Sequence, residues 1–269
     1  IKQKDICANG YTLEVRLYAE DPSTDFLPVT GTIHKFETPN VKGLRVETSI
    51  CSGSEISIYY DPMIAKIIVH DTTRANAHRK LRHVLRNMVC LGVTTNQDFL
   101  LKVCANELFH KGKYNTHFIQ ENPKLIKSNT ENDTQHDTIL IAASLFNWKE
   151  RNNNRSLLAS IPSGWRNNYY SHQSEKFSVN DKTSNIKYKY FSDAFEFYIK
   201  DNTYSARLIN LNNNIIRVEI DAILYEFNIV KEKQNFYIHN ESLGNITISE
   251  LDRFPEVEKQ KQKGAYESP

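Results

Sequence analysis

A glutamate and an arginine stand two residues apart within residues 10–21, GYTLEVRLYAED, and this pair has the clearest capacity for chemistry in the chain. Residues 11–17 alternate polar and apolar side chains, which is typical of a half-buried strand, so Glu14 and Arg16 share its polar face. A neighbouring carboxylate can hold a guanidinium in place and leave its fork directed at a second anion. The alternative is an ordinary surface salt bridge, which contributes little to stability.

Two further polar residues lie within 59–70, YYDPMIAKIIVH. Asp61 precedes Pro62, a position where aspartate is common because its side chain stabilises turns. Lys66 interrupts a segment that is otherwise typical of a central strand. Its ammonium either extends to solvent or pairs with a buried carboxylate, and we favour a structural role for it. The sequence contains no Gly-rich phosphate loop.

The elements that must position these residues form an α+β unit. Alternation and turn residues predict strands over 11–17, 31–37, 44–50, 56–60 and 63–70. Residues 71–73 and 94–96, DTT and TTN, are typical helix starts, and the second predicts a helix over 97–104. Several antiparallel strands covered by two helices on one side are expected.

The second half predicts a different architecture. Residues 121–135 are polar and indicate a linker, and residues 137–150 form a helix that is apolar nearly all round and therefore enclosed by protein. About eight short strands follow, each ended by turn residues. They are expected over 175–179, 185–191, 195–199, 204–211, 215–220, 224–230, 235–239 and 246–251. An even number of hairpin strands after one apolar helix predicts a small antiparallel β-barrel around that helix.

Composition excludes several classes of function. The 34 basic and 32 acidic residues give a net charge of +2, too balanced to indicate nucleic acid or a membrane surface as partner, and no apolar run is long enough to span a bilayer. The four cysteines form no C-x-x-C pair, which predicts reduced thiols of an intracellular protein. The chain begins at Ile1 without Met and ends in a charged tail, so we expect a fragment of a longer protein.

Several motifs of the first half occur together in the order of one known family. They are residues 10–21, Phe26-Leu27-Pro28, residues 59–66, Gly92-Val93-Thr94-Thr95-Asn96 and Thr116-His117-Phe118. With them, about the first 120 residues resemble the C-terminal part of the biotin carboxylase domain of biotin-dependent carboxylases. One departure is Tyr11, where that family usually has His.

This resemblance implies an ATP-dependent ligase that carboxylates biotin with bicarbonate. It implies that Arg16 contacts the bicarbonate or ureido oxygen and stabilises the biotin enolate, that Glu14 braces Arg16, and that Asp61 faces the same pocket and orients it. For Asp61, simple turn chemistry remains an equal alternative. The family's ATP and its Mg²⁺ or Mn²⁺ would be bound upstream, in an ATP-grasp half absent from this sequence, so no metal site and no turnover are expected in this piece alone.

The second half resembles, by position and pattern, the mediating domain of acyl-CoA carboxylase α subunits of the propionyl-CoA and methylcrotonyl-CoA types. In such subunits this domain helps to dock the carboxyltransferase β subunit. Residues 161–167, IPSGWRN, are its sharpest motif, and Trp165 and Arg166 are residue types common in binding hot spots. The alternative is that Trp165 closes one end of the barrel.

The resulting domain organisation has four parts: a biotin carboxylase C-terminal subdomain at 1–122, a linker at 123–136, the barrel at 137–251, and a linker at 252–269 toward a missing biotinyl carrier domain. We expect a hetero-oligomer, in the cytoplasm of a bacterium or in the mitochondrial matrix. Two other interpretations stay open: a non-catalytic ligand-binding or scaffold barrel, and a fragment of pyruvate or urea carboxylase.

Overall fold

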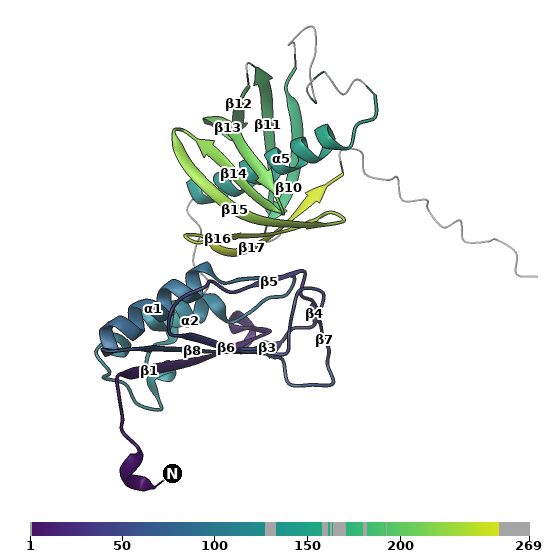
Figure 1. Ribbon diagram of the computed structural model, residues 1–269. Coiled ribbons are helices and arrows are strands. Elements are labelled where there is room, and N and C mark those ends of the chain that lie inside the picture. The colour runs from purple at the N-terminus through teal and green to yellow at the C-terminus, as the bar shows by residue number, and fades with distance from the viewer. Residues whose placement is uncertain are drawn as a thin grey trace, which may run out of the picture.

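A computed structural model describes residues 2–126, 133–157, 161, 163, 171–179, 182–191 and 193–252. The described residues form two units, each around its own hydrophobic core (Figure 1). Among the described residues, no helix has the length and apolar character needed to cross a membrane.

The N-terminal unit is built on a three-stranded antiparallel sheet of order β1-β8-β6, which comprises β1 (Tyr11–Tyr18), β8 (Met63–Asp71) and β6 (Leu44–Glu47). Helices α1 (Arg74–Asn87) and α2 (Gln97–Ala105) cover one face, the face nearer the barrel in Figure 1. That face carries the alternating apolar residues of the three strands, of which Leu17, Ile67 and Val69 are fully buried. Because the period of a strand is two, the intervening polar residues lie on the opposite face.

The remaining elements of this unit are short. Its other paired strands are β2 (Glu20–Asp21), β3 (Leu27–Pro28), β4 (Gly31–Thr32), β5 (Lys35–Glu37), β7 (Glu55–Ile56) and β9 (Val89–Leu91). Its other helices are η1 (Gln3–Asp5), η2 (Pro22–Thr24), α3 (Glu107–His110), α4 (Phe118–Glu121) and η3 (Pro123–Leu125).

Three of the predicted strands are shorter than expected. Segment 31–37 is divided into β4 and β5, and segment 56–60 is extended only at its start, in β7. β6 ends at Glu47 because the Thr48 hydroxyl accepts from the Ile50 N–H at 2.9 Å and donates to the Ile64 carbonyl at 2.7 Å. Local bonds of this kind compete with the ladder bonds of a sheet.

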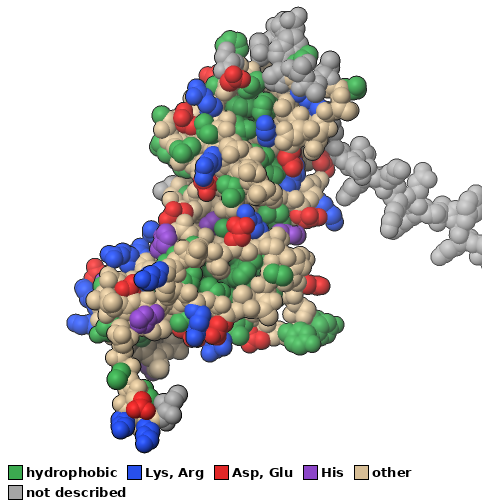
Figure 2. Space-filling model, viewed as in Figure 1, with side chains coloured by type: hydrophobic (Ala, Val, Ile, Leu, Met, Phe, Trp, Pro, Cys, Tyr) green, Lys and Arg blue, Asp and Glu red, His purple; other side chains and the backbone are tan. Residues whose placement is uncertain are grey.

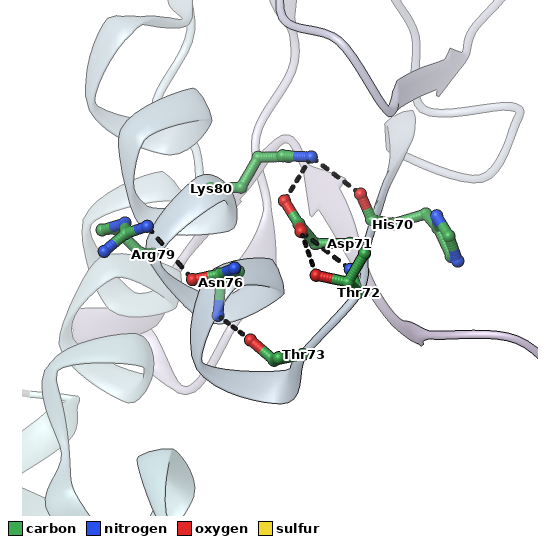
Figure 3. A network of polar contacts seen from close by, with 7 residues as sticks. All are labelled: His70, Asp71, Thr72, Thr73, Asn76, Arg79 and Lys80. Atoms are coloured by element: carbon green, nitrogen blue, oxygen red, sulfur yellow. Dashed lines mark hydrogen bonds and ion pairs between the residues drawn. The ribbon is translucent and has the colours of Figure 1, made fainter.

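A polar network fixes the turn from β8 into α1 (Figure 3). Lys80 donates to the Asp71 carboxylate at 2.7 Å and to the His70 carbonyl at 2.8 Å. The Asp71 carboxylate also accepts from the Thr72 N–H, and the Thr73 hydroxyl caps α1 by accepting from the Asn76 N–H. The predicted helix start at 71–73 is therefore confirmed.

The C-terminal unit is a closed eight-stranded antiparallel barrel around one helix, α5 (Asp133–Asn153). Its strands are β10 (Gln173–Val179), β11 (Lys182–Phe191), β12 (Ala194–Ile199), β13 (Asn202–Asn212), β14 (Ile215–Ile220), β15 (Ile223–Glu232), β16 (Asn235–Asn240) and β17 (Gly244–Leu251). The predicted α+β fold, with about eight strands around an apolar helix, is confirmed. Side chains of α5 fill the barrel together with inward residues such as Phe177, Phe227 and Phe236, all fully buried.

Some charged side chains are turned into the barrel unit. Asp137, at the start of α5, is fully buried and accepts from the Tyr204 hydroxyl at 2.7 Å. At the other end of α5, Arg151 contacts Glu175 at 2.7 Å and donates to the Tyr188 hydroxyl at 2.8 Å. Burial raises the pKa of Glu175, and the charge of Arg151 opposes that rise.

Hairpin β16–β17 of the barrel rests on the N-terminal unit, and histidines show at the junction (Figure 2). The Asn245 amide donates to the Cys90 carbonyl at 3.2 Å and to Gln97 Oε1 at 3.0 Å. His239 is buried beside Asn245, with its Nδ1 2.7 Å from Asn245 Oδ1, and burial lowers its pKa. Lys35 donates to Asn228 Oδ1 at 2.7 Å at the same junction. Directed bonds of this kind fix the orientation of one unit on the other.

Candidate functional site

The candidate site is the open face of the β1-β8-β6 sheet, away from the helices and from the barrel. Arg16 pairs with Lys66 across β1 and β8, and Lys66 pairs with Glu47 across β8 and β6. In the next row, Glu14 and Arg45 both pair with Ile68. Directly paired residues project to the same side, so this face presents three cations and two carboxylates. Figure 2 shows basic and acidic side chains next to one another along this edge of the unit.

Arg16 is held by its two neighbours on the same strand face. Its Nε lies 3.7 Å from Glu14 Oε1, and the two side chains are 56% and 46% exposed. The pKa of Arg16 is raised, first by the hydrogen bond and charge of the Tyr18 side chain and to a smaller extent by Glu14. The guanidinium therefore stays charged at any physiological pH and keeps donors available on its solvent side. The predicted pairing of Glu14 with Arg16 is present.

A second arginine–glutamate pair occurs on β6, in the reverse order along its strand. Arg45 Nη2 lies 3.3 Å from Glu47 Oε1, and both side chains are about as exposed as those of the first pair. Lys66 stands between the two pairs, and no ion pair of Lys66 occurs within the part of the chain that the structure describes. The interpretation of Lys66 as the buried partner of a carboxylate is therefore not supported. Its position directly beside Arg16 was not predicted from the sequence.

Asp61 makes a turn bond in the structure. Its Oδ1 accepts from the Met63 N–H at 2.8 Å, and its side chain is exposed. Burial and then the charge of Asp61 raise the pKa of Glu20, so these two carboxylates are near neighbours at the end of β1. Across the described ranges no hydrogen bond or ion pair joins Asp61 to Arg16. The turn interpretation accounts for what is seen, and an orienting role for Asp61 stays a prediction.

Trp165 and Arg166, the predicted docking residues, lie outside the described residues. Ser163 lies close to them in sequence, and its carbonyl accepts from the Trp148 indole at 2.8 Å. Trp148 packs against Tyr190 and Phe195 with ring centroids 5.1 and 5.0 Å apart. Trp148 is therefore part of the barrel core, and both interpretations of Trp165 stay predictions.

Potential metal ligands and thiols can be located only where the structure is described. Within those ranges, no three His, Cys, Asp or Glu side chains form a group that could hold a metal ion. Cys7 and Cys51 are exposed, whereas Cys90 and Cys104 are buried, and all four are free thiols. Burial raises the pKa of Cys90 and of Cys104 to about 12, which leaves both as inert thiols at neutral pH.

Two residues that contact Arg16 were missed from the sequence. Tyr18 shares the strand face of Arg16, so the alternation that found Glu14 could also have found it. Asn96 lies 80 positions away, and its side chain bonds the backbone of β1. No local sequence pattern predicts this contact between Asn96 and β1.

Comparison with known proteins agrees with this geometry. The family model described as the biotin carboxylase C-terminal domain matches residues 14–121, which include the whole Arg16 face. Residues 14–121 are a biotin carboxylase C-terminal domain. The resemblance predicted for the first half is confirmed.

Relatives of this biotin carboxylase C-terminal domain are themselves carboxylases. The chain is 44% identical over 119 residues to biotin carboxylase 2 of Bacillus subtilis, which is 44% of this chain and 27% of that protein. It is 40% identical over 149 residues to the mitochondrial propionyl-CoA carboxylase alpha chain of Sus scrofa, 54% of this chain and 20% of that protein. The chain thus spans about a fifth to a quarter of the length of these relatives.

Among solved structures, the biotin carboxylase domain of a thermophilic 2-oxoglutarate carboxylase, bound to bicarbonate, aligns with 48% of this chain and 29% of that one. The TM-score is 0.47 and the sequence identity 36%.

Proposed function

We propose that this chain is part of the α subunit of an acyl-CoA carboxylase, in which the sheet face around Arg16 serves the ATP- and bicarbonate-dependent carboxylation of biotin. The observation that supports the proposal is the charged guanidinium of Arg16, which Glu14 and Tyr18 hold on the open sheet face of residues 14–121. The upstream ATP-grasp half would supply ATP and its Mg²⁺ or Mn²⁺. The piece alone would not turn over.

In this proposal Arg16 binds the oxygen on which negative charge grows. Bicarbonate and the ureido oxygen of biotin are small anionic or polarised groups, and a guanidinium can donate to them with two parallel N–H bonds. Groups placed where charge develops in the transition state stabilise it more than the ground state. Lys66, on the neighbouring strand, would place a second positive charge near the same anion, as a point charge and not as a bidentate donor.

An acyl-CoA carboxylase is preferred because of the extent of the match. The similarity to the propionyl-CoA carboxylase alpha chain runs over 149 residues and so continues beyond the matched family domain at 14–121. One of these relatives is described as mitochondrial and another is bacterial, and on that basis we propose the mitochondrial matrix or the bacterial cytoplasm as the location of the parent protein.

The role of Arg16 is tested in a protein extended to the length of these relatives, which we call the extended protein. In Arg16→Ala, the rate of ATP cleavage driven by free biotin and bicarbonate is expected to fall about a hundred- to a thousandfold, because one charge-stabilising donor is lost. Arg45→Ala is the matched control, since it removes the other exposed arginine of the same face, and we expect its rate to stay within about twofold. A wild-type rate in Arg16→Ala would remove Arg16 from the mechanism.

For the barrel we propose that it docks the carboxyltransferase β subunit through the sequence segment that carries Trp165 and Arg166. Aromatic and arginine side chains on an interface loop commonly carry most of its binding energy. Trp165→Ala is expected to weaken assembly by about 2 kcal/mol or more, measured as the dissociation constant for the β subunit in size-exclusion or calorimetric titrations. Phe191→Ala, an exposed side chain elsewhere on the barrel, is the control. Equal weakening by both variants would count against docking through this segment.

A further inference from the structure

Asn96 stands immediately before α2, where the sequence predicts a helix cap, yet its side chain does not cap that helix. The Thr95 hydroxyl accepts from the Gln97 N–H instead, at 3.4 Å. The Asn96 side chain turns away from α2 and is almost completely buried, at 5% exposure. An amide buried in this way is expected to have specific partners elsewhere.

Those partners are backbone groups of β1 on either side of Leu17. Asn96 Nδ2 donates to the Arg16 carbonyl at 3.3 Å, and Asn96 Oδ1 accepts from the Tyr18 N–H at 3.0 Å. The backbone N–H of Asn96 also donates to the Tyr18 carbonyl at 3.2 Å. One residue therefore makes three hydrogen bonds to β1 at the positions that flank Leu17.

These bonds lie on the free edge of the sheet. β1 is an edge strand, because the order is β1-β8-β6, and its pairing with β8 shifts register between Leu17 and Tyr18. A strand edge at a bulge has unpaired backbone groups and would otherwise be free to twist. Asn96 replaces the missing neighbour strand at that point.

The backbone next to Asn96 is fixed by the hydrogen bonds of its neighbour Gln97. The next residue, Gln97, is buried and donates to the carbonyls of Leu85 and Met88 at 2.7 and 2.8 Å, at the end of α1. Gln97 Oε1 accepts from Asn245 of the barrel. The group that holds β1 is thus fixed both to the helical layer and to the second unit.

We propose that Asn96 is a positioning residue for Arg16, because its amide clamps the backbone from which the guanidinium extends. This inference rests on the proposed function of Arg16. The guanidinium is more than half exposed and its contacts are on the surface, so its placement depends on the backbone beneath it. A displacement of about 1 Å at such a group can cost about a hundredfold in rate.

The contact is tested first in the present chain, by hydrogen exchange of the Tyr18 amide. Asn96→Ala removes the acceptor, and the exchange of that amide is expected to accelerate about tenfold or more. Asn96→Asp keeps the acceptor and loses the donor to Arg16, so we expect the amide to stay protected. Asn106→Ala is the matched control, because Asn106 is also a cap asparagine but bonds Leu108 and Asn122 and not β1. Unchanged exchange in a folded Asn96→Ala chain would overturn the clamp.

The role in the reaction is tested with a double-mutant cycle in the extended protein. Asn96→Ala and Asn96→Asp are expected to lower kcat for ATP cleavage driven by free biotin about a hundredfold when Arg16 is present. In the Arg16→Ala background the same changes are expected to cost less than about threefold, because residues that act as a unit are non-additive. If Asn96 has only a structural role, its substitution lowers kcat by the same factor whether or not Arg16 is present. If that result is found and Arg16→Ala is itself slow, the positioning role of Asn96 is overturned while the proposed function of Arg16 stands. A wild-type rate in Arg16→Ala would instead overturn the proposed function.

Discussion

The two units of this chain use antiparallel strands in opposite ways. The N-terminal sheet covers one face with helices and leaves the other open, with two free edges and a row of charged side chains. The barrel has no free edge, surrounds α5 with apolar side chains, and turns Asp137 and Glu175 inward. A unit that leaves a face of paired charges open can receive a ligand there, whereas the interior of the barrel is already filled by α5 and the inward side chains of the strands.

The largest expected effect on stability is in the barrel core. Phe236 is fully buried and packs edge to face on Phe146 and Phe177, so Phe236→Ala is expected to cost about 3–5 kcal/mol of unfolding free energy. Trp148 lies in the barrel core, so its fluorescence in urea follows the unfolding of the barrel. Tyr59→Ala, at an 83% exposed site of the first unit, is the control and should change stability by less than about 0.5 kcal/mol.

A smaller effect on stability is expected when a polar interaction is removed, and it should differ between the buried polar groups of the barrel and the exposed ones of the open sheet face. Tyr204→Phe leaves the buried Asp137 carboxylate without its 2.7 Å hydroxyl partner and is expected to cost about 1–3 kcal/mol. Glu47→Gln, on the open face, removes an exposed ion pair and should cost less than about 0.5 kcal/mol. Urea denaturation of both variants measures the contrast, and equal losses would show that the two units do not differ in this respect.

The smallest effect concerns pH and lies at the β8–α1 turn of Figure 3. The hydrogen bond from Lys80, followed by that from the Thr72 N–H, lowers the pKa of Asp71 from 3.8 to about 2. A carboxyl whose pKa is depressed by folding stabilises the folded state above its unfolded pKa of 3.8, and this contribution is lost as pH falls through 3.8 and then through the folded value of about 2.

Asp71→Asn should therefore be less stable than the natural chain at pH 7, and the difference should shrink as pH falls toward 2 and vanish only below the folded pKa of about 2. Thermal unfolding followed by circular dichroism across that range checks this. Lys80→Met should reproduce the loss, because it removes the same interaction from the other side. A stability difference that stays the same size between pH 7 and pH 2 would contradict the pKa assignment.

How far the sequence predicts the structure also differs between the units. All eight barrel strands were predicted, because their alternation is clear and their turns use residues that accept positive φ, such as Asn213 and Asn214 at 47° and 65°. In the first unit, segments 44–50 and 56–60 are less extended than expected, because strand length there is set by side-chain bonds such as that of Thr48.

The site was predictable only in part. Glu14 and Arg16 are neighbours on one strand, so local periodicity brings them together. Lys66 joins them through sheet register, and Asn96 through a long-range contact with an edge strand, neither of which a local pattern specifies. Helix-cap propensity indicated the right position for Asn96 and the wrong partner, because the unpaired edge of β1 offers its amide two backbone groups.

The proposed division of roles, with chemistry on the open sheet and docking on the barrel, is tested most directly by one measurement on the extended protein with its β subunit. For each variant, the rate of ATP cleavage driven by free biotin is compared with the rate of overall acyl-CoA carboxylation. Arg16→Ala is predicted to lower both rates by the same factor, about a hundredfold or more, whereas Trp165→Ala should lower only the overall rate. A free-biotin reaction that is untouched by Arg16→Ala, or that falls equally in the two variants, would contradict the assignment of chemistry to the open sheet and of docking to the barrel.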